Sequence, residues 1–207
     1  MAATEEHPMQ ALNEFLPDNS FEQTVAFLHQ YKVHLTVTRE RKSILGDYRN
    51  AMHGKNHRIS VNGNLNKYAF LLTLLHELAH LLTFEKYKHT VQAHGKEWKH
   101  IYASLLKDFL QKKIFPHDIE QAIMQSLHNP AASTCAEESL TRVLKKYDSR
   151  SSDMFLVEEL PHGAIFKTKD GRMFQRGEKQ RKRYRCKELG TNVMYLFSAV
   201  YEVKKVG

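Results

Sequence analysis

His76-Glu77-Leu78-Ala79-His80 is an HExxH sequence inside an apolar segment that spans residues 68–84. Each residue of an α-helix advances by ~100°, so the two histidines lie about 40° apart and one turn from each other. They can share a tetrahedral Zn²⁺, and the Glu77 carboxylate can reach a water bound to that ion. Because apolar residues flank the motif on nearly every side, we expect a buried helix whose ionisable groups need a strong partner. The stretch therefore predicts a zinc site of the kind found in hydrolases, with His76 and His80 as ligands and Glu77 as the catalytic base.

A third zinc ligand is expected, because a catalytic zinc site uses three protein ligands and leaves one position to water, and the chain offers candidates for it after His80. The metzincin pattern is excluded, since it requires glycine at position 83 and histidine at position 86, where this chain has Thr83 and Lys86. The remaining candidates downstream are Glu85, His89, His94 and Glu97.

His94 and Glu97 are the best placed of these candidates. A thermolysin-like site would use a downstream glutamate, and Glu97 has a suitable spacing. His94 precedes Gly95, which lets the backbone turn sharply into a helix predicted over residues 98–110. In that arrangement His94 lies where the second helix packs back on the first, and Glu97 orients a ligand instead of binding the metal.

The periodicity of the chain predicts an α+β fold, beginning with a domain over residues 1–150. Its sheet is expected to be small and antiparallel and to lead into the HExxH helix, as in a zincin-like metalloprotease domain. We expect strand 58–61 to be the edge strand of the cleft, where an extended substrate can pair with it. The other predicted elements are strands over 33–37 and 46–49, a helix capped by the Ser20 hydroxyl, and helices over 117–127 and 136–147 with a break at Asn129-Pro130.

Residues 151–207 are predicted to form a small, basic, antiparallel β module that holds no metal. The polar, turn-rich segment 148–153 marks the boundary before it. Two strands over 164–168 and 172–174 are expected to form a hairpin, and the last strands are predicted over 183–186 and 194–203.

Positive charge is concentrated in this last module. The chain carries a net charge of +8, and residues 167–187 alone contain ten lysines and arginines against two acidic residues. A solvated charged face is one interpretation of such a run, and a nucleic-acid surface is the other. The neighbouring aromatic residues Phe166, Phe174, Tyr184 and Tyr201 favour the second, because aromatic rings can stack on bases. The candidate DNA-binding residues are Lys167, Lys169, Arg172, Arg176, Arg181, Lys182, Arg183 and Arg185.

The motifs together resemble the SprT-like metalloprotease family, which includes the Spartan-type proteases. HELAH is followed fourteen residues later by HGKEW, and the likeness extends upstream through LGDYR at 45–49 and HRISVN at 57–62. It covers about residues 21–110. The resemblance implies a zincin fold with one zinc ion, the ligands His76, His80 and His94, and Glu77 as the catalytic residue. It also implies a protein substrate bound or crosslinked to DNA.

One feature departs from that family. SprT-type proteins often carry a C-terminal zinc ribbon with four cysteine ligands, whereas this chain has only Cys135 and Cys186. The usual ribbon therefore cannot form here.

Three functions follow as hypotheses. The first is a zinc endopeptidase that acts on DNA-associated proteins, with His100, Tyr102 or Tyr87 as unranked candidates for stabilising the oxyanion. The second is a zinc peptidase without a DNA role, in which the basic module binds acidic protein partners. The third is a nucleic-acid-binding module with structural zinc, which needs a fourth protein ligand such as His89 or Glu97.

Composition bounds the setting in which the chain works. No apolar run approaches the ~20 residues of a membrane-spanning helix, so no membrane partner is expected. The first residues lack the basic and apolar regions of a signal peptide, and two distant cysteines give no disulfide framework. These features predict a cytoplasmic protein.

Overall fold

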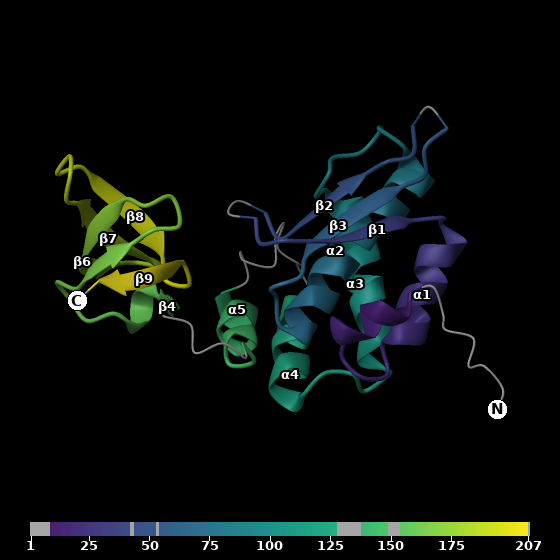
Figure 1. Ribbon diagram of the computed structural model, residues 1–207, viewed down its shortest axis with the longest axis horizontal. Coiled ribbons are helices and arrows are strands. Elements are labelled where there is room, and N and C mark those ends of the chain that lie inside the picture. The colour runs from purple at the N-terminus through teal and green to yellow at the C-terminus, as the bar shows by residue number, and fades with distance from the viewer. Residues whose placement is uncertain (1–8, 42–43, 53, 128–137, 149–153, 207) are drawn as a thin grey trace. The chain divides into compact units, whose positions relative to one another are not determined.

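The chain folds into two compact units, Met1–Tyr147 and Asp148–Gly207. The computed structural model describes residues 9–41, 44–52, 54–127, 138–148 and 154–206 (Figure 1). The predicted break at Asn129-Pro130, residues 136 and 137 of the predicted helix, and most of the predicted boundary at 148–153 lie outside the described residues. The units combine helices with two sheets, which confirms the α+β class.

The sheet of the N-terminal unit is mixed. Its strands β1 (His34–Thr38), β2 (Gly46–Arg49) and β3 (Arg58–Asn62) follow the order β1-β3-β2. Strand β3 runs parallel to β1 and antiparallel to β2, so the prediction of a purely antiparallel sheet was wrong. The prediction that strand 58–61 forms the edge was also wrong, because β3 is paired on both sides and buries Ile59 and Val61. Alternation identifies a strand but not its neighbours, and β2 is the edge strand that borders the cleft described below.

The HExxH helix is α2 (Lys67–Tyr87), and it is buried on all sides over most of its length, as its apolar flanks predict. Its N-cap is Asn66, whose side chain accepts the Ala69 N–H at 2.9 Å. Helix α3 (Lys96–Leu110) packs against α2, and Figure 1 shows both on the same side of the three-stranded sheet. The remaining helices of this unit are η1 (Gln10–Glu14), α1 (Phe21–Gln30), α4 (His117–Ser126) and α5 (Glu138–Lys145).

Ser20 lies at the N-cap of α1 but does not cap it with its side chain. The hydroxyl instead donates to the Pro17 carbonyl at 2.6 Å, a bond that tightens the preceding turn and competes with capping. The predicted side-chain cap was therefore wrong, although the helix starts where it was expected.

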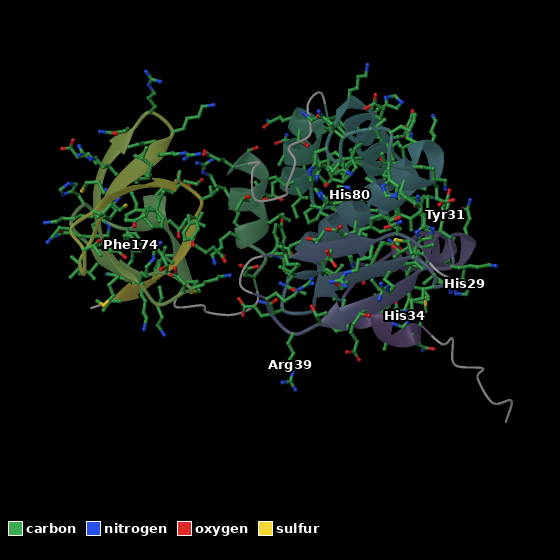
Figure 2. The ribbon with its side chains drawn as sticks, turned by 90° about the horizontal axis from the view of Figure 1, so that it is seen from above. His29, Tyr31, His34, Arg39, His80 and Phe174 are labelled. Carbon is green, nitrogen blue, oxygen red and sulfur yellow. The ribbon has the colours of Figure 1, made fainter. Side chains whose placement is uncertain are left out.

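The C-terminal unit, taken by itself, is one antiparallel sheet with the strand order β4-β9-β5-β6-β7-β8. Its core contains Phe166, Phe174, Tyr184 and Phe197, and Figure 2 labels Phe174 among the strands of this unit. No helix among the described residues is long and apolar enough to cross a membrane. The strands are β4 (Met154–Leu156), β5 (Ile165–Lys167), β6 (Met173–Gln180), β7 (Arg183–Glu188), β8 (Met194–Ser198) and β9 (Glu202–Val206), with the short helix η3 (Val157–Glu159) after β4.

Candidate metal centre

Three histidines converge at the point where α2 meets the start of α3. Helix α2 supplies His76 and His80 one turn apart, and the turn before α3 supplies His94. The Nε2 atom of His76 lies 3.2 Å from that of His80 and 3.3 Å from that of His94. Ligands about 2.05 Å from a tetrahedral Zn²⁺ are separated by ~3.3 Å, so these two spacings fit such an ion. Within the described residues, no other histidine, cysteine or carboxylate joins this cluster.

The surroundings keep these imidazoles neutral, which is the form that binds a metal. Burial, with smaller contributions from the nearby His80 and His94, lowers the pKa of His76 to about 3. Burial, with a contribution from His94, lowers the pKa of His80 to about 4. The pKa of His94 is also lowered, first by burial and then by the charge of Lys99. The nitrogen lone pairs are therefore available at neutral pH.

Trp98 packs against all three histidine rings. Its ring centroid lies 4.7 Å from that of His76, 5.3 Å from that of His80 and 4.8 Å from that of His94. The indole is fully buried, and Tyr102 stacks on it at 5.0 Å. Sequence reasoning treated Trp98 only as an apolar position of α3. Its place one turn after His94 is the signal that could have identified it as the support of the three histidine rings.

Glu77 lies beside the cluster and faces a cleft of about 660 Å³ bordered by strand β2. Burial, together with the nearby Asp47 carboxylate and against the opposing charge of Arg41, raises the pKa of its carboxyl to about 8. A bound cation would favour the ionised form of this group. Gly46 of β2 leaves room for the carboxyl, because a Cβ at that position would lie 2.5 Å from Oε1 of Glu77.

The other candidate ligands lie elsewhere. Glu85 is 3.4 Å from Nε2 of His57 and 3.1 Å from Nζ of Lys88. His89 lines the cleft and packs on Phe84 at 5.1 Å, and Glu97 stands in the first turn of α3. None of the three candidates for stabilising the oxyanion, Tyr87, His100 and Tyr102, is among the described residues that line the cleft. Tyr48 of β2 does line it.

The predicted DNA-binding residues fall into different settings within the C-terminal unit. Lys167, Arg183 and Arg185 are exposed on the outer side of the sheet, where Lys187, missed by the sequence reasoning, joins them. Arg181 and Lys182 are exposed at the turn between β6 and β7.

The remaining three cations are engaged within the unit. Lys169 is 3.6 Å from Glu202, and Arg172 is 3.1 Å from Asp170 and 3.4 Å from Glu188. The Arg176 guanidinium lies 4.2 Å from the centroid of the Tyr184 ring.

The aromatic residues of this unit mostly face its core. Phe166 and Phe174 have no exposed surface and Tyr184 is buried, while Tyr201 is exposed. The prediction that the first three stack on bases was therefore wrong, because strand alternation turns them away from the cationic side. The outer side offers positive charge without these rings.

Comparison with known protein families gives a match to the N-terminal part of the chain. The model of the SprT-like family matches residues 9–119, just over half of the chain, from η1 to the start of α4. The matched region contains the whole histidine cluster and ends before the C-terminal unit. Neither the curated proteins nor the solved structures returned a match.

Proposed function

The chain belongs to the SprT-like family, and from that membership and the histidine geometry we propose that it is a zinc-dependent endopeptidase. The family is of metallopeptidase type and typically depends on zinc. His76, His80 and His94 would hold one Zn²⁺, which when bound polarises a carbonyl and lowers the pKa of water toward neutrality. Glu77 takes a proton from the attacking water and delivers it to the leaving amine.

The observation that carries this proposal is the convergence of three neutral imidazoles beside a buried carboxylate at an open cleft. A structural zinc site would need a fourth protein ligand, and the described residues place only three in the cluster. This arrangement favours a catalytic site over a nucleic-acid module with structural zinc.

The cleft suits an extended peptide. Among the residues that the structure describes, strand β2 pairs with β3 alone, so its other edge can form main-chain hydrogen bonds with a substrate strand. Gly46, Asp47 and Tyr48 of β2 line the cleft together with His76 and Glu77. A substrate paired with β2 would therefore pass beside the metal ligands and the catalytic carboxylate.

We further propose that the substrates are proteins associated with DNA or crosslinked to it. The support is the outer side of the C-terminal sheet, which carries Lys167, Arg183, Arg185 and Lys187. Because Phe166, Phe174 and Tyr184 are buried, contacts with phosphates suit this surface better than stacking on bases. DNA held there would raise the effective concentration of DNA-bound proteins at the cleft. The rival is a peptidase whose basic surface binds acidic proteins instead.

A digestion assay tests the function. A DNA-binding protein is incubated with the zinc-loaded chain, with and without DNA, and Glu77→Gln is run in parallel. We expect cleavage that DNA accelerates, and a loss of ~10²-fold or more in Glu77→Gln with zinc content unchanged, because the amide cannot accept the proton. Cleavage at the wild-type rate by Glu77→Gln would exclude Glu77 as the base. Cleavage that DNA does not change would favour the peptidase without a DNA role.

A further inference from the structure

Tyr48 connects the edge strand of the cleft to the metal-binding helix. Its ring lies nearly parallel to the His80 ring, with an interplanar angle of 4° and centroids 6.5 Å apart. Its hydroxyl is 3.0 Å from Nδ1 of His57, the residue that immediately precedes β3. Tyr48 therefore reaches both a metal ligand and the neighbouring strand.

The hydrogen bonds around His57 fix the direction of this contact. The Ala51 N–H points at Nδ1 from 3.2 Å, so Nδ1 is an acceptor and the ring proton resides on Nε2. Nε2 then carries its proton 3.4 Å from Oε1 of Glu85, and the Tyr48 hydroxyl donates to Nδ1. The His57 carbonyl accepts from the His34 N–H at 2.8 Å, which ties the same residue to β1.

The opposite end of β2 is held by a separate set of bonds. The Asn62 amide donates to the Ile44 carbonyl at 3.0 Å, and Arg41 donates to the Leu45 carbonyl at 3.4 Å. Ile44 and Leu45 are the two residues before Gly46, so this network fixes the start of β2. The Tyr48 hydroxyl is thus the side-chain tie at the other end of a four-residue strand.

We propose that Tyr48, His57 and Glu85 form a brace that positions the edge strand β2 over the metal ligands and thereby sets the place where a substrate strand docks. Tyr48 is a positioning residue in this scheme, acting through β2 and the His80 ring. The docking part of the inference rests on the proposed peptidase function, whereas the brace itself does not. The three residues of the brace come from different parts of the fold. Tyr48 belongs to β2, His57 immediately precedes β3, and Glu85 belongs to helix α2.

Tyr48→Phe isolates the hydroxyl, because it keeps the ring beside His80 and removes only the bond to His57. We expect the amides of residues 46–49 to exchange with deuterium roughly fivefold faster than in the wild type, the factor expected from one lost hydrogen bond. KM for a peptide substrate should rise by a similar factor, with kcat and zinc affinity changing less. If Tyr48 had only a structural role, Tyr48→Phe would lower the stability of the protein without raising KM more than it changes kcat.

Tyr147→Phe is the matched control, because it also removes one tyrosine hydrogen bond in the same unit, to Asp118 at 2.7 Å. It should leave exchange in β2 and KM unchanged. Equal exchange of residues 46–49 in Tyr48→Phe and Tyr147→Phe would overturn the brace. Because exchange is measured without substrate, this result stays distinct from a failure of the peptidase function, which would appear as inactive wild-type protein.

Substitutions of Glu85 test the far end of the brace. Glu85→Gln keeps an oxygen acceptor for His57 and should behave as the wild type, whereas Glu85→Ala should speed exchange in β2. If the two variants behave alike, Glu85 is not part of the brace, and the proposal in this form is wrong.

Discussion

The position and charge of the Glu77 carboxyl depend on neighbours that the HExxH pattern does not include. Gly46 stands against its carboxyl, Asp47 adds negative charge nearby, and Arg41 opposes that charge. The spacing of His76, Glu77 and His80 was readable because a single helix fixes it. The packing of Trp98 on the three imidazoles was not, because it depends on how α3 folds back on α2.

Gly46→Ala should lower peptidase activity strongly while zinc remains bound. A Cβ at this position would lie 2.5 Å from Oε1 of Glu77 and 2.8 Å from a methyl of Thr73, so the carboxyl has to move. A displacement of ~1 Å can cost on the order of 10²-fold in rate. Steady-state kinetics and metal analysis measure the two effects. Gly190→Ala, where a Cβ meets nothing within 4 Å, is the matched control and should keep full activity.

His94→Ala should reduce zinc occupancy far more than Glu97→Ala. The Nε2 atom of His94 lies 3.3 Å from that of His76 inside the cluster, whereas Glu97 is not part of it. Loss of a direct ligand outweighs loss of a residue that only orients one. Metal analysis of both purified variants decides between them, and equal zinc content in His94→Ala and the wild type would show that His94 is not the third ligand.

At the scale of elements, the periodicity of apolar residues predicted the helices well but the sheet only in part. Helix α2 was recognisable because apolar residues surround its motif, and α3 because they recur along one face. The order of the strands was not recognisable, since alternation carries no information about which strand lies beside which. Strand β3 lies in the centre of the sheet, parallel to β1 on one side and antiparallel to β2 on the other.

Helix α2 should make the metal-free protein acid-labile. The pKa values of His76 and His80, lowered to about 3 and about 4, lie below the ~6.5 of an unfolded histidine. Below pH ~6.5 the unfolded chain binds protons that the folded chain does not, so the free energy of unfolding falls as the pH drops toward those values. Above pH ~7 this contribution is constant.

Thermal unfolding of the metal-free Glu77→Gln variant between pH 8 and 5 measures this effect. The pKa of Glu77, raised to about 8, would otherwise titrate in the same window and stabilise the folded state as the pH falls, whereas carboxylates with ordinary pKa values titrate largely below it. His80→Gln removes one buried titrating ring and should flatten the decline in Tm. An equally steep decline in that variant would assign the acid lability to other groups.

At the scale of the whole molecule, the basic composition conceals two kinds of cation in the C-terminal unit. Lys169 and Arg172 are paired with Glu202, Asp170 and Glu188, whereas Arg183 and Arg185 stand on the outer side of β7. A count of charge along the sequence cannot separate them, because Lys169 pairs with Glu202 and Arg172 with Glu188 only when the sheet has folded.

Two double variants with the same change of charge test whether the outer side binds DNA. Arg183→Gln with Arg185→Gln removes two exposed cations, and Lys169→Gln with Arg172→Gln removes two paired ones. Phosphate affinity follows the number of neutralised charges, so the first variant should bind duplex DNA more weakly and reduce the salt slope by about two. The second should bind nearly as the wild type does, although with some loss of stability from its broken ion pairs.

Fluorescence anisotropy over a range of salt concentrations measures the DNA affinity of both variants. Equal weakening in the two variants would mean that net charge alone governs binding, and unchanged affinity in both would leave acidic proteins as the partner of this surface. Zinc content should stay the same throughout, because the three proposed metal ligands lie in the other unit.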